Sequence, residues 1–246
     1  MYFVGVDLAW GDRNPTGVAI LDSGGSLRHV GVAGSDDEVL AHLEPFTAGP
    51  CVVAFDAPLV VTNPSGNRPA EAALNRDFRR FDAGTHPANT GLAWFADGGR
   101  AARLCAALGL DLDPRSSGRR KALEVYPHAA SVALFRLAKT LKYKQKQGRD
   151  VDGLRSELLR LMAFVESLHA ASPSLEVGGC PQWMQLKNDV TRATRKSELR
   201  RAEDPVDAVL CAYVARYATE RPDAVTIYGD PATGCIVTPT LLGPGF

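Results

Sequence analysis

The sequence has no excess of charge of either sign. Its 246 residues include 28 Lys and Arg together and 28 Asp and Glu together, so the formal net charge is zero. Such a chain has no overall positive field to attract nucleic acid, and any phosphate must be bound by local groups. A hydrophobic content of 45% is enough for a sizeable core, and we expect one large domain over residues 1–246.

Long apolar runs and paired cysteines are also missing. No stretch of about 18 consecutive apolar residues occurs, and the start of the sequence does not resemble a cleavable export signal. We therefore expect no membrane segment and a cytoplasmic location. The five cysteines are far apart and show no CxxC spacing, which argues against a disulfide framework and against a zinc site.

The apolar patterns that are present predict an α/β fold. Alternating or continuous apolar runs predict strands at residues 2–9, 16–21 and 27–33, a fourth from 51 that ends at Asp56, and a fifth from 121 that ends near Glu124. Helical periodicity and capping residues predict helices at residues 35–43, 69–81, 100–108, 128–141, 151–170, from about 183, and 203–218. Residues 224–239 read as a hairpin with its turn near 230–234. The first three strands are expected to pair antiparallel.

Residues 57–119 form a long segment between the predicted fourth and fifth strands. The segment is rich in Gly, Pro, Asn and Arg, and it is too long for an ordinary connection. It is therefore expected to be either an elaborated crossover or an insertion that faces a substrate.

An aspartate interrupts the first predicted strand. Alternation places Asp7 on the same face as Gly5 and Ala9, so its small neighbours are expected to leave space above the carboxylate for an ion or substrate. The alternative is a structural acid that is bonded to backbone or to an arginine of the insertion.

Two further acids follow the carboxyl ends of predicted strands. Asp56 ends the fourth strand at the edge of the sheet where ligands collect in open α/β folds, although an Asx turn before Pro58 is an alternative role. Glu124 repeats the pattern at the end of the fifth strand, and its alternative is an exposed glutamate at a sheet edge.

The stretch "EDPVDAVLCAYVARYA" contains two more acids. Asp204 as N-cap, Pro205 as the first helical residue and Asp207 in the first turn would be explained by helix chemistry alone. However, Asp207 also begins a stripe of apolar residues at spacings of three, four and seven, so it points toward the sheet.

If these acids converge, they need a cation. Two carboxylates about 4 Å apart repel by roughly 4 kcal/mol at an effective dielectric near 20. Oxygen ligands without His or Cys select hard ions such as Mg²⁺ or Mn²⁺. Two such ions would activate a water and stabilise the leaving oxygen of a phosphodiester.

The order of strands and acids resembles the ribonuclease H-like superfamily. More closely, the motifs "GVDLAW", "VAFDAP", "LEVYP", "YKQKQGRDVDGLRSELL" and "DPVDAVLCAYVA" resemble a family of uncharacterised proteins described as predicted ribonuclease H-like nucleases, over most of the chain. The resemblance implies a mixed sheet of three antiparallel strands followed by parallel ones, with helices on both faces and the insertion 57–119 between the fourth and fifth strands.

The resemblance also implies roles for the acids. Asp7 would match the acid of the first strand, Asp56 that of the fourth strand, and Asp207, with Asp204, the acids of the last helix. Glu124 matches an acid of the closer family rather than of the whole superfamily.

Three basic segments concentrate positive charge in this neutral chain: "RSSGRRK", "KYKQKQGR" and "RATRKSELRR". Such segments are suited to phosphates, but charge runs are usually solvated faces, which is the alternative for each segment. The expected substrate-binding residues are Lys144, Lys146 and Arg149 from the second segment, with Arg76 and His86 from the insertion.

The function expected from these observations is a Mg²⁺- or Mn²⁺-dependent nuclease. Its metal ligands would be Asp7, Asp56, Asp207 and Asp204, Glu124 would assist them in catalysis, and the partner would be DNA or RNA. One alternative is a nucleotide-binding phosphotransferase of the actin-like or sugar-kinase type, although duplicated halves and a second glycine-rich loop are not seen. The other is a non-catalytic nucleic-acid-binding protein that keeps the acids for structure.

Overall fold

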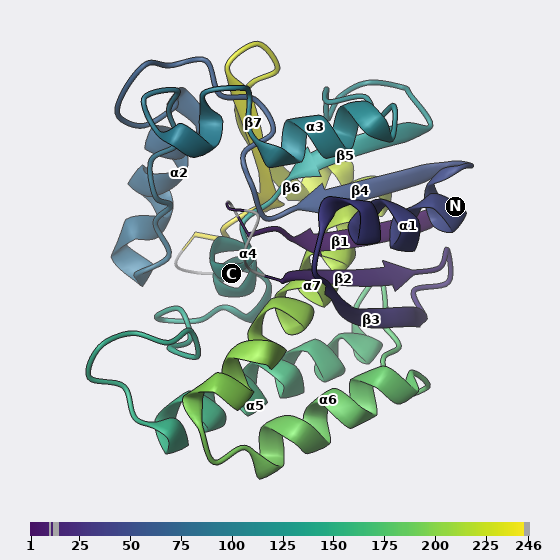
Figure 1. The fold of residues 1–246 in the computed structure, drawn as a ribbon, viewed down its shortest axis with the longest axis vertical. Coiled ribbons are helices and arrows are strands. Elements are labelled where there is room, and N and C mark those ends of the chain that lie inside the picture. The colour runs from purple at the N-terminus through teal and green to yellow at the C-terminus, as the bar shows by residue number, and fades with distance from the viewer. Residues whose placement is uncertain (10, 12–14, 244–246) are drawn as a thin grey trace.

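A computed structural model describes residues 1–9, 11 and 15–243, and its centre is a mixed five-stranded sheet in the order β3-β2-β1-β4-β5 (Figure 1). The strands are β1 (Tyr2–Asp7), β2 (Thr16–Leu21), β3 (Leu27–Ala33), β4 (Cys51–Phe55) and β5 (Arg120–Glu124). β1, β2 and β3 pair antiparallel, whereas β4 is parallel to β1 and β5 is parallel to β4. The predicted α/β class and the change from antiparallel to parallel pairing are confirmed.

Helices cover both faces of this sheet. One face carries α7 (Lys196–Glu220), with α5 (Val151–Ser167) and α6 (Pro181–Arg192) packed beyond it, and the other carries α1 (Asp36–Thr47) and α3 (Arg100–Ala107). None of the helices in the described part of the chain is long and apolar enough to cross a membrane.

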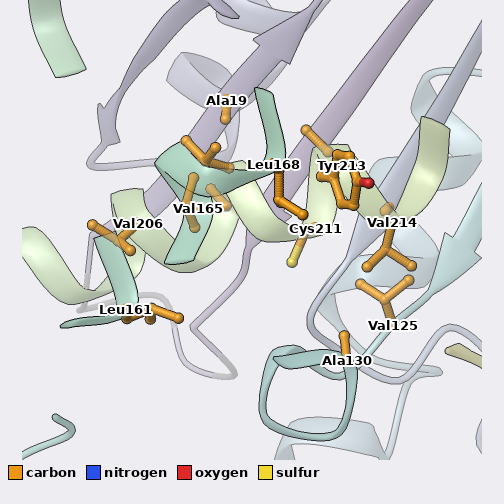
Figure 2. Close-up of a cluster of buried hydrophobic side chains, with 14 of the residues drawn as sticks. Ala19, Val125, Ala130, Leu161, Val165, Leu168, Val206, Cys211, Tyr213 and Val214 are labelled. Carbon is orange, nitrogen blue, oxygen red and sulfur yellow. The ribbon is translucent and has the colours of Figure 1, made fainter. Parts of the chain in front are cut away.

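The core on the α7 side joins three layers. Figure 2 shows Val206, Cys211 and Val214 of α7 in one cluster of buried side chains with Leu161 and Val165 from α5. These side chains are fully buried, so apolar burial holds the long helix in a fixed position on the sheet.

Two glycines allow the backbone of α7 to lie directly on the strands. A Cβ at Gly5 would lie 1.9 Å from the carbonyl oxygen of Ala208, and a Cβ at Gly17 would lie 2.1 Å from that of Asp204. The expectation that Gly5 leaves open space beside Asp7 was therefore wrong, because the helix backbone fills that space.

The insertion lies between β4 and β5, as predicted. It carries α2 (Pro69–Phe78), which packs against the hairpin of β6 (Val225–Asp230) and β7 (Gly234–Pro239), and it also carries α3 on the sheet. The predicted hairpin is confirmed. The carboxyl ends of β1 and β4 point toward the side of the molecule on which α2 lies (Figure 1).

The helix after β5 is shorter than predicted. α4 (Pro127–Phe135) ends at Arg136, whose φ of 50° is left-handed, and the amide of Thr140 then donates to the carbonyl of Phe81 at 2.8 Å. Since every side of this short helix is apolar, periodicity alone did not mark its end. The chain that follows runs across the carboxyl ends of the strands, with Tyr143 buried.

The last long helix begins earlier than predicted. α7 starts at Lys196, where Glu198 accepts from the amide of Arg195 at 3.0 Å and caps the helix. Asp204 is therefore not an N-cap, and Pro205 lies inside the helix. Helix capping does not explain Asp204 and Asp207.

Candidate functional site

A pocket of about 450 Å³ opens at the carboxyl ends of β1 and β4. Asp7, the last residue of β1, and Asp56, directly after β4, lie in its lining. Residues 84–86 of the insertion and the chain between α4 and α5 contribute further side chains. The insertion and the chain between α4 and α5 thus enclose the edge at which parallel strands present their terminal residues, the usual place for ligands in such sheets.

The ammonium of Lys144 lies among three carboxylates. Its Nζ is 2.6 Å from Oδ2 of Asp207, 3.2 Å from Oδ2 of Asp7 and 3.5 Å from Oδ1 of Asp204. The acids of β1 and α7 therefore converge in the structure, which the sequence left as a condition. Lys144 was predicted to bind a substrate phosphate, but the structure shows that it is the counter-ion of these acids.

Asp56 lines the pocket together with Asp7. Among the described residues, its carboxylate has no hydrogen bond or ion pair. It nevertheless interacts electrostatically with Lys144 and with the neighbouring acids. Burial raises the pKa of Asp56 to about 8, and the charges of Asp207 and Glu124 add to the rise while Lys144 opposes it. Burial likewise raises the pKa of Asp7 well above its usual range.

One ammonium does not neutralise this group. Burial raises the pKa of Asp204, and that of the neighbouring Glu203 to about 7, although Lys144 lowers both. Burial lowers the pKa of Lys144 itself, but Asp207 and Asp7 outweigh burial and hold that pKa well above its usual range. The acids around Lys144 therefore outnumber the one cation with which three of them pair.

A tyrosine that the sequence analysis did not single out orients Asp207. The hydroxyl of Tyr143 donates to Oδ1 of Asp207 at 2.7 Å and lies 3.4 Å from Nδ1 of His128. Burial lowers the pKa of His128 to about 4, so this imidazole is neutral at pH 7. The only sequence signal was an aromatic residue inside the polar stretch "KYKQKQ", beside the lysine that joins the acids.

Glu124 has a different partner from the one predicted. Its Oε1 is 2.5 Å from Nη2 of Arg68, and its Oε2 accepts from Nη1 of Arg68 at 2.9 Å and from the amide of Leu59 at 3.0 Å. Glu124 thus lines the pocket with its carboxylate bound to an arginine, and the expectation that it assists the metal ligands is not supported by this geometry.

Arg68 also forms an ion pair with a second buried acid, Glu71. The sequence did not identify either Arg68 or Glu71 as part of the site. Nε of Arg68 is 2.9 Å from Oε1 of Glu71, while the oxygens of Glu71 also accept from the amide of Ala88 at 3.1 Å. The spacing of Arg68 and Glu71 around Pro69, at the start of a helix, was the available signal.

The predicted phosphate-binding residues divide into two groups. Lys146, Arg149 and His86 line the pocket, and Nη1 of Arg149 donates to the carbonyl of Lys144 at 2.6 Å. Arg76 does not line this pocket, because it lies on the outer face of α2.

The carboxylates do not form a ready metal site around this lysine. Over residues 1–9, 11 and 15–243, no three His, Cys, Asp or Glu side chains are arranged to hold a metal ion. Oδ2 of Asp207 is buried, and within the described part of the chain the ammonium of Lys144 is its partner.

The fold and the site define an α/β protein with a carboxylate-lined pocket at the switch between antiparallel and parallel strands. The chain belongs to the family described as "Protein of unknown function (DUF429)", whose model matches residues 5–233. No curated protein and no solved structure matches it. The matched range includes all the acids of the pocket.

Proposed function

We propose that this pocket hydrolyses phosphodiester bonds of nucleic acid with Mg²⁺ or Mn²⁺ held by Asp7, Asp56, Asp204 and Asp207. The observation that carries the proposal is the imbalance of charge: Asp7, Asp204 and Asp207 share the single ammonium of Lys144, and the buried Asp56 beside them has no ion pair in the described part of the chain. Like charges at such separations destabilise one another, and a hard dication would relieve the repulsion.

The donor set fits such an ion. All four side chains offer carboxylate oxygens and none offers nitrogen or sulfur, which favours Mg²⁺ or Mn²⁺ over zinc. Three of the carboxylates already surround one cationic atom, and the buried Oδ2 of Asp207 has no other partner in the described chain. The ion would take the place of the Lys144 ammonium, which stands on a chain segment outside any helix or strand.

The chemistry of the bound ion would be to polarise the phosphate and lower the pKa of a water. The residues of the chain have three tasks. Asp7 and Asp207 hold the ion against the end of β1, Tyr143 fixes the orientation of Asp207, and Lys146 and Arg149 bind phosphate oxygens at the pocket wall. The likeness to ribonuclease H-like nucleases, in the order of strands and acids, also supports this function.

Metal titration tests the proposal. We expect Mn²⁺ to bind the wild-type protein in calorimetry and Asp7→Asn to weaken binding by more than about tenfold, since one unit charge at about 4 Å is worth roughly 4 kcal/mol. Lys144→Met should tighten binding, because the ammonium no longer competes. The control is Asp82→Asn, which removes an exposed acid of the same pocket that pairs with Lys142 and should leave the affinity unchanged.

Cleavage assays complete the test. With Mn²⁺, the wild-type protein should cleave at least one member of a panel of branched DNA, RNA and hybrid substrates, and Asp7→Asn should abolish that cleavage. Cleavage that persists in Asp7→Asn would refute the assignment. Stabilisation by ATP without nuclease activity would instead favour a phosphotransferase, and nucleic-acid affinity that ignores divalent ions would favour a binding protein.

A further inference from the structure

Three surface hollows share lining residues and form one continuous groove. The acid pocket shares Asp82 and residues 84–86 with a neighbouring hollow of about 400 Å³. That hollow in turn shares Asn67, Asn75 and Arg79 with a third, of about 580 Å³, on the outer face of α2. A path therefore leads from the carboxylates over the insertion.

The outer end of this groove is positively charged. Arg76, Arg79 and Arg80 line it from one face of α2 and the turn that follows, and all three are exposed. Within the described chain, the side chains of Arg76 and Arg79 have no acidic partner. The adjacent Asp77 accepts from the hydroxyl of Tyr228 at 2.6 Å.

The middle of the groove is a fixed structure. Oδ1 of Asn75 accepts from the amide of Thr85 at 2.7 Å, and a Cβ at Gly84 would lie 2.8 Å from the same oxygen. The acid in this part, Asp82, is neutralised by Lys142 at 2.9 Å and by Lys139 at 3.4 Å. The connection between the pocket and the arginines thus carries no uncompensated negative charge.

We infer that this groove holds one strand of nucleic acid by its phosphates, along a path from the acid pocket past Thr85 and His86 to Arg79 and Arg76. Residues three apart on a helix lie about 5–6 Å from each other, so these arginines can contact successive phosphates. A pocket of about 450 Å³ has the size that encloses a small ligand, which fits one nucleotide rather than a base-paired duplex. The inference rests on the proposed function and narrows its substrate to single-stranded segments or ends.

Salt-dependent binding tests the groove without catalysis. Fluorescence anisotropy in EDTA would measure the affinity for labelled ten-nucleotide strands of thymidine and of uridine over a series of NaCl concentrations. Each lost phosphate contact lowers the salt slope by about 0.7 for single strands, so Arg76→Ala/Arg79→Ala should lower it by about 1.4 (2 × 0.7) and weaken binding. Arg76→Lys/Arg79→Lys should keep the wild-type slope because the charges remain.

A matched double variant controls for net charge. Arg103 and Arg119 are exposed and line none of the three hollows, so Arg103→Ala/Arg119→Ala removes the same charge elsewhere. If both alanine pairs change the salt slope and the affinity equally, or if neither changes them, the proposed role of the groove is overturned. The same measurement on a blunt ten-base-pair duplex tests the preference for single strands. Tighter binding of the duplex than of the strands, with the same loss of affinity in Arg76→Ala/Arg79→Ala, would overturn that preference.

The outcomes separate this inference from the proposed function. A slope change confined to Arg76→Ala/Arg79→Ala, in a protein that neither binds Mn²⁺ nor cleaves, would support the groove and refute the hydrolase. Metal-dependent cleavage in a protein whose strand affinity ignores both arginines would support the hydrolase and refute the groove.

Discussion

At the scale of single residues, the site depends on how one lysine is shared. Lys144 contacts Asp7, Asp204 and Asp207, while Asp56 has no direct partner in the described chain. A buried ion pair stabilises little in net terms, because desolvation offsets the attraction, but an unpaired buried charge is costly. The acids are therefore better explained by a function than by stability.

The raised pKa values predict how stability depends on pH. Burial raises the pKa of Asp56 to about 8 and that of Glu203 to about 7, above their unfolded values near 4. The folded state then binds more protons than the unfolded state, so the free energy of unfolding falls as pH rises. We expect urea denaturation in EDTA to show greater stability at pH 6.5 than at pH 8.5.

In Asp56→Asn, the difference in unfolding free energy between pH 6.5 and pH 8.5 should be smaller by on the order of 1–2 kcal/mol, because the asparagine amide does not ionise. His128 has the opposite effect on stability, because burial lowers its pKa to about 4. That effect makes the folded state less stable as the pH falls, mainly below the unfolded pKa near 6.5. Stability that rises with pH between 6.5 and 8.5 would contradict the raised pKa of Asp56.

At the scale of elements, the position of α7 brings the acids together. The helix lies so close to β1 and β2 that only glycine fits at positions 5 and 17. Asp204 and Asp207 reach Lys144, which lines the pocket, because their helix crosses the sheet beside β1.

Gly5→Ala should therefore disturb both stability and the site. The added Cβ would lie 1.9 Å from the carbonyl oxygen of Ala208, so α7 must shift, at a cost of about 3 kcal/mol or more in unfolding free energy. Gly49→Ala, where a Cβ meets nothing within 4 Å, should change stability by less than about 0.5 kcal/mol. Similar urea midpoints for the two variants would show that the close approach does not constrain the helix.

At the scale of the whole molecule, a buried charge network attaches the insertion to the sheet. Arg68 bonds Glu124 at the end of β5, Glu71 in its own helix and the carbonyl of Val60. The same insertion forms one wall of the acid pocket and carries the arginine groove. The network thus fixes the substrate-facing part of the molecule relative to the acids.

Arg68→Met is expected to lower the free energy of unfolding by about 3–5 kcal/mol, because it leaves Glu124 and Glu71 buried without a cation. Limited proteolysis should also cut faster between residues 60 and 88. Arg28→Met breaks a surface pair with Asp22 instead and should cost less than about 1 kcal/mol. Equal losses in the two variants would mean that the buried network adds no more than a surface pair.

The strands, the hairpin and the acids at strand ends were predictable because they depend on local pattern. The apolar run before Asp56 marked a buried strand, whereas Asp7 was predicted inside a strand over residues 2–9 and ends β1 in the structure. The end of α4 and the start of α7 were not predicted correctly. A left-handed Arg136 and a cap made by Arg195 and Glu198 leave only weak sequence signals.

Sequence alone was sufficient for the class of fold and for the four aspartates and Glu124, but not for Glu71 and Glu203, since local patterns mark strands and their ends and not every buried acid. The folded arrangement was needed to assign partners: Lys144 to the three aspartates, Arg68 to Glu124, and Tyr143 to Asp207. Those contacts join residues that are 56 or more positions apart. Distance and burial, which set the strength of a charge interaction, exist only once the chain has folded.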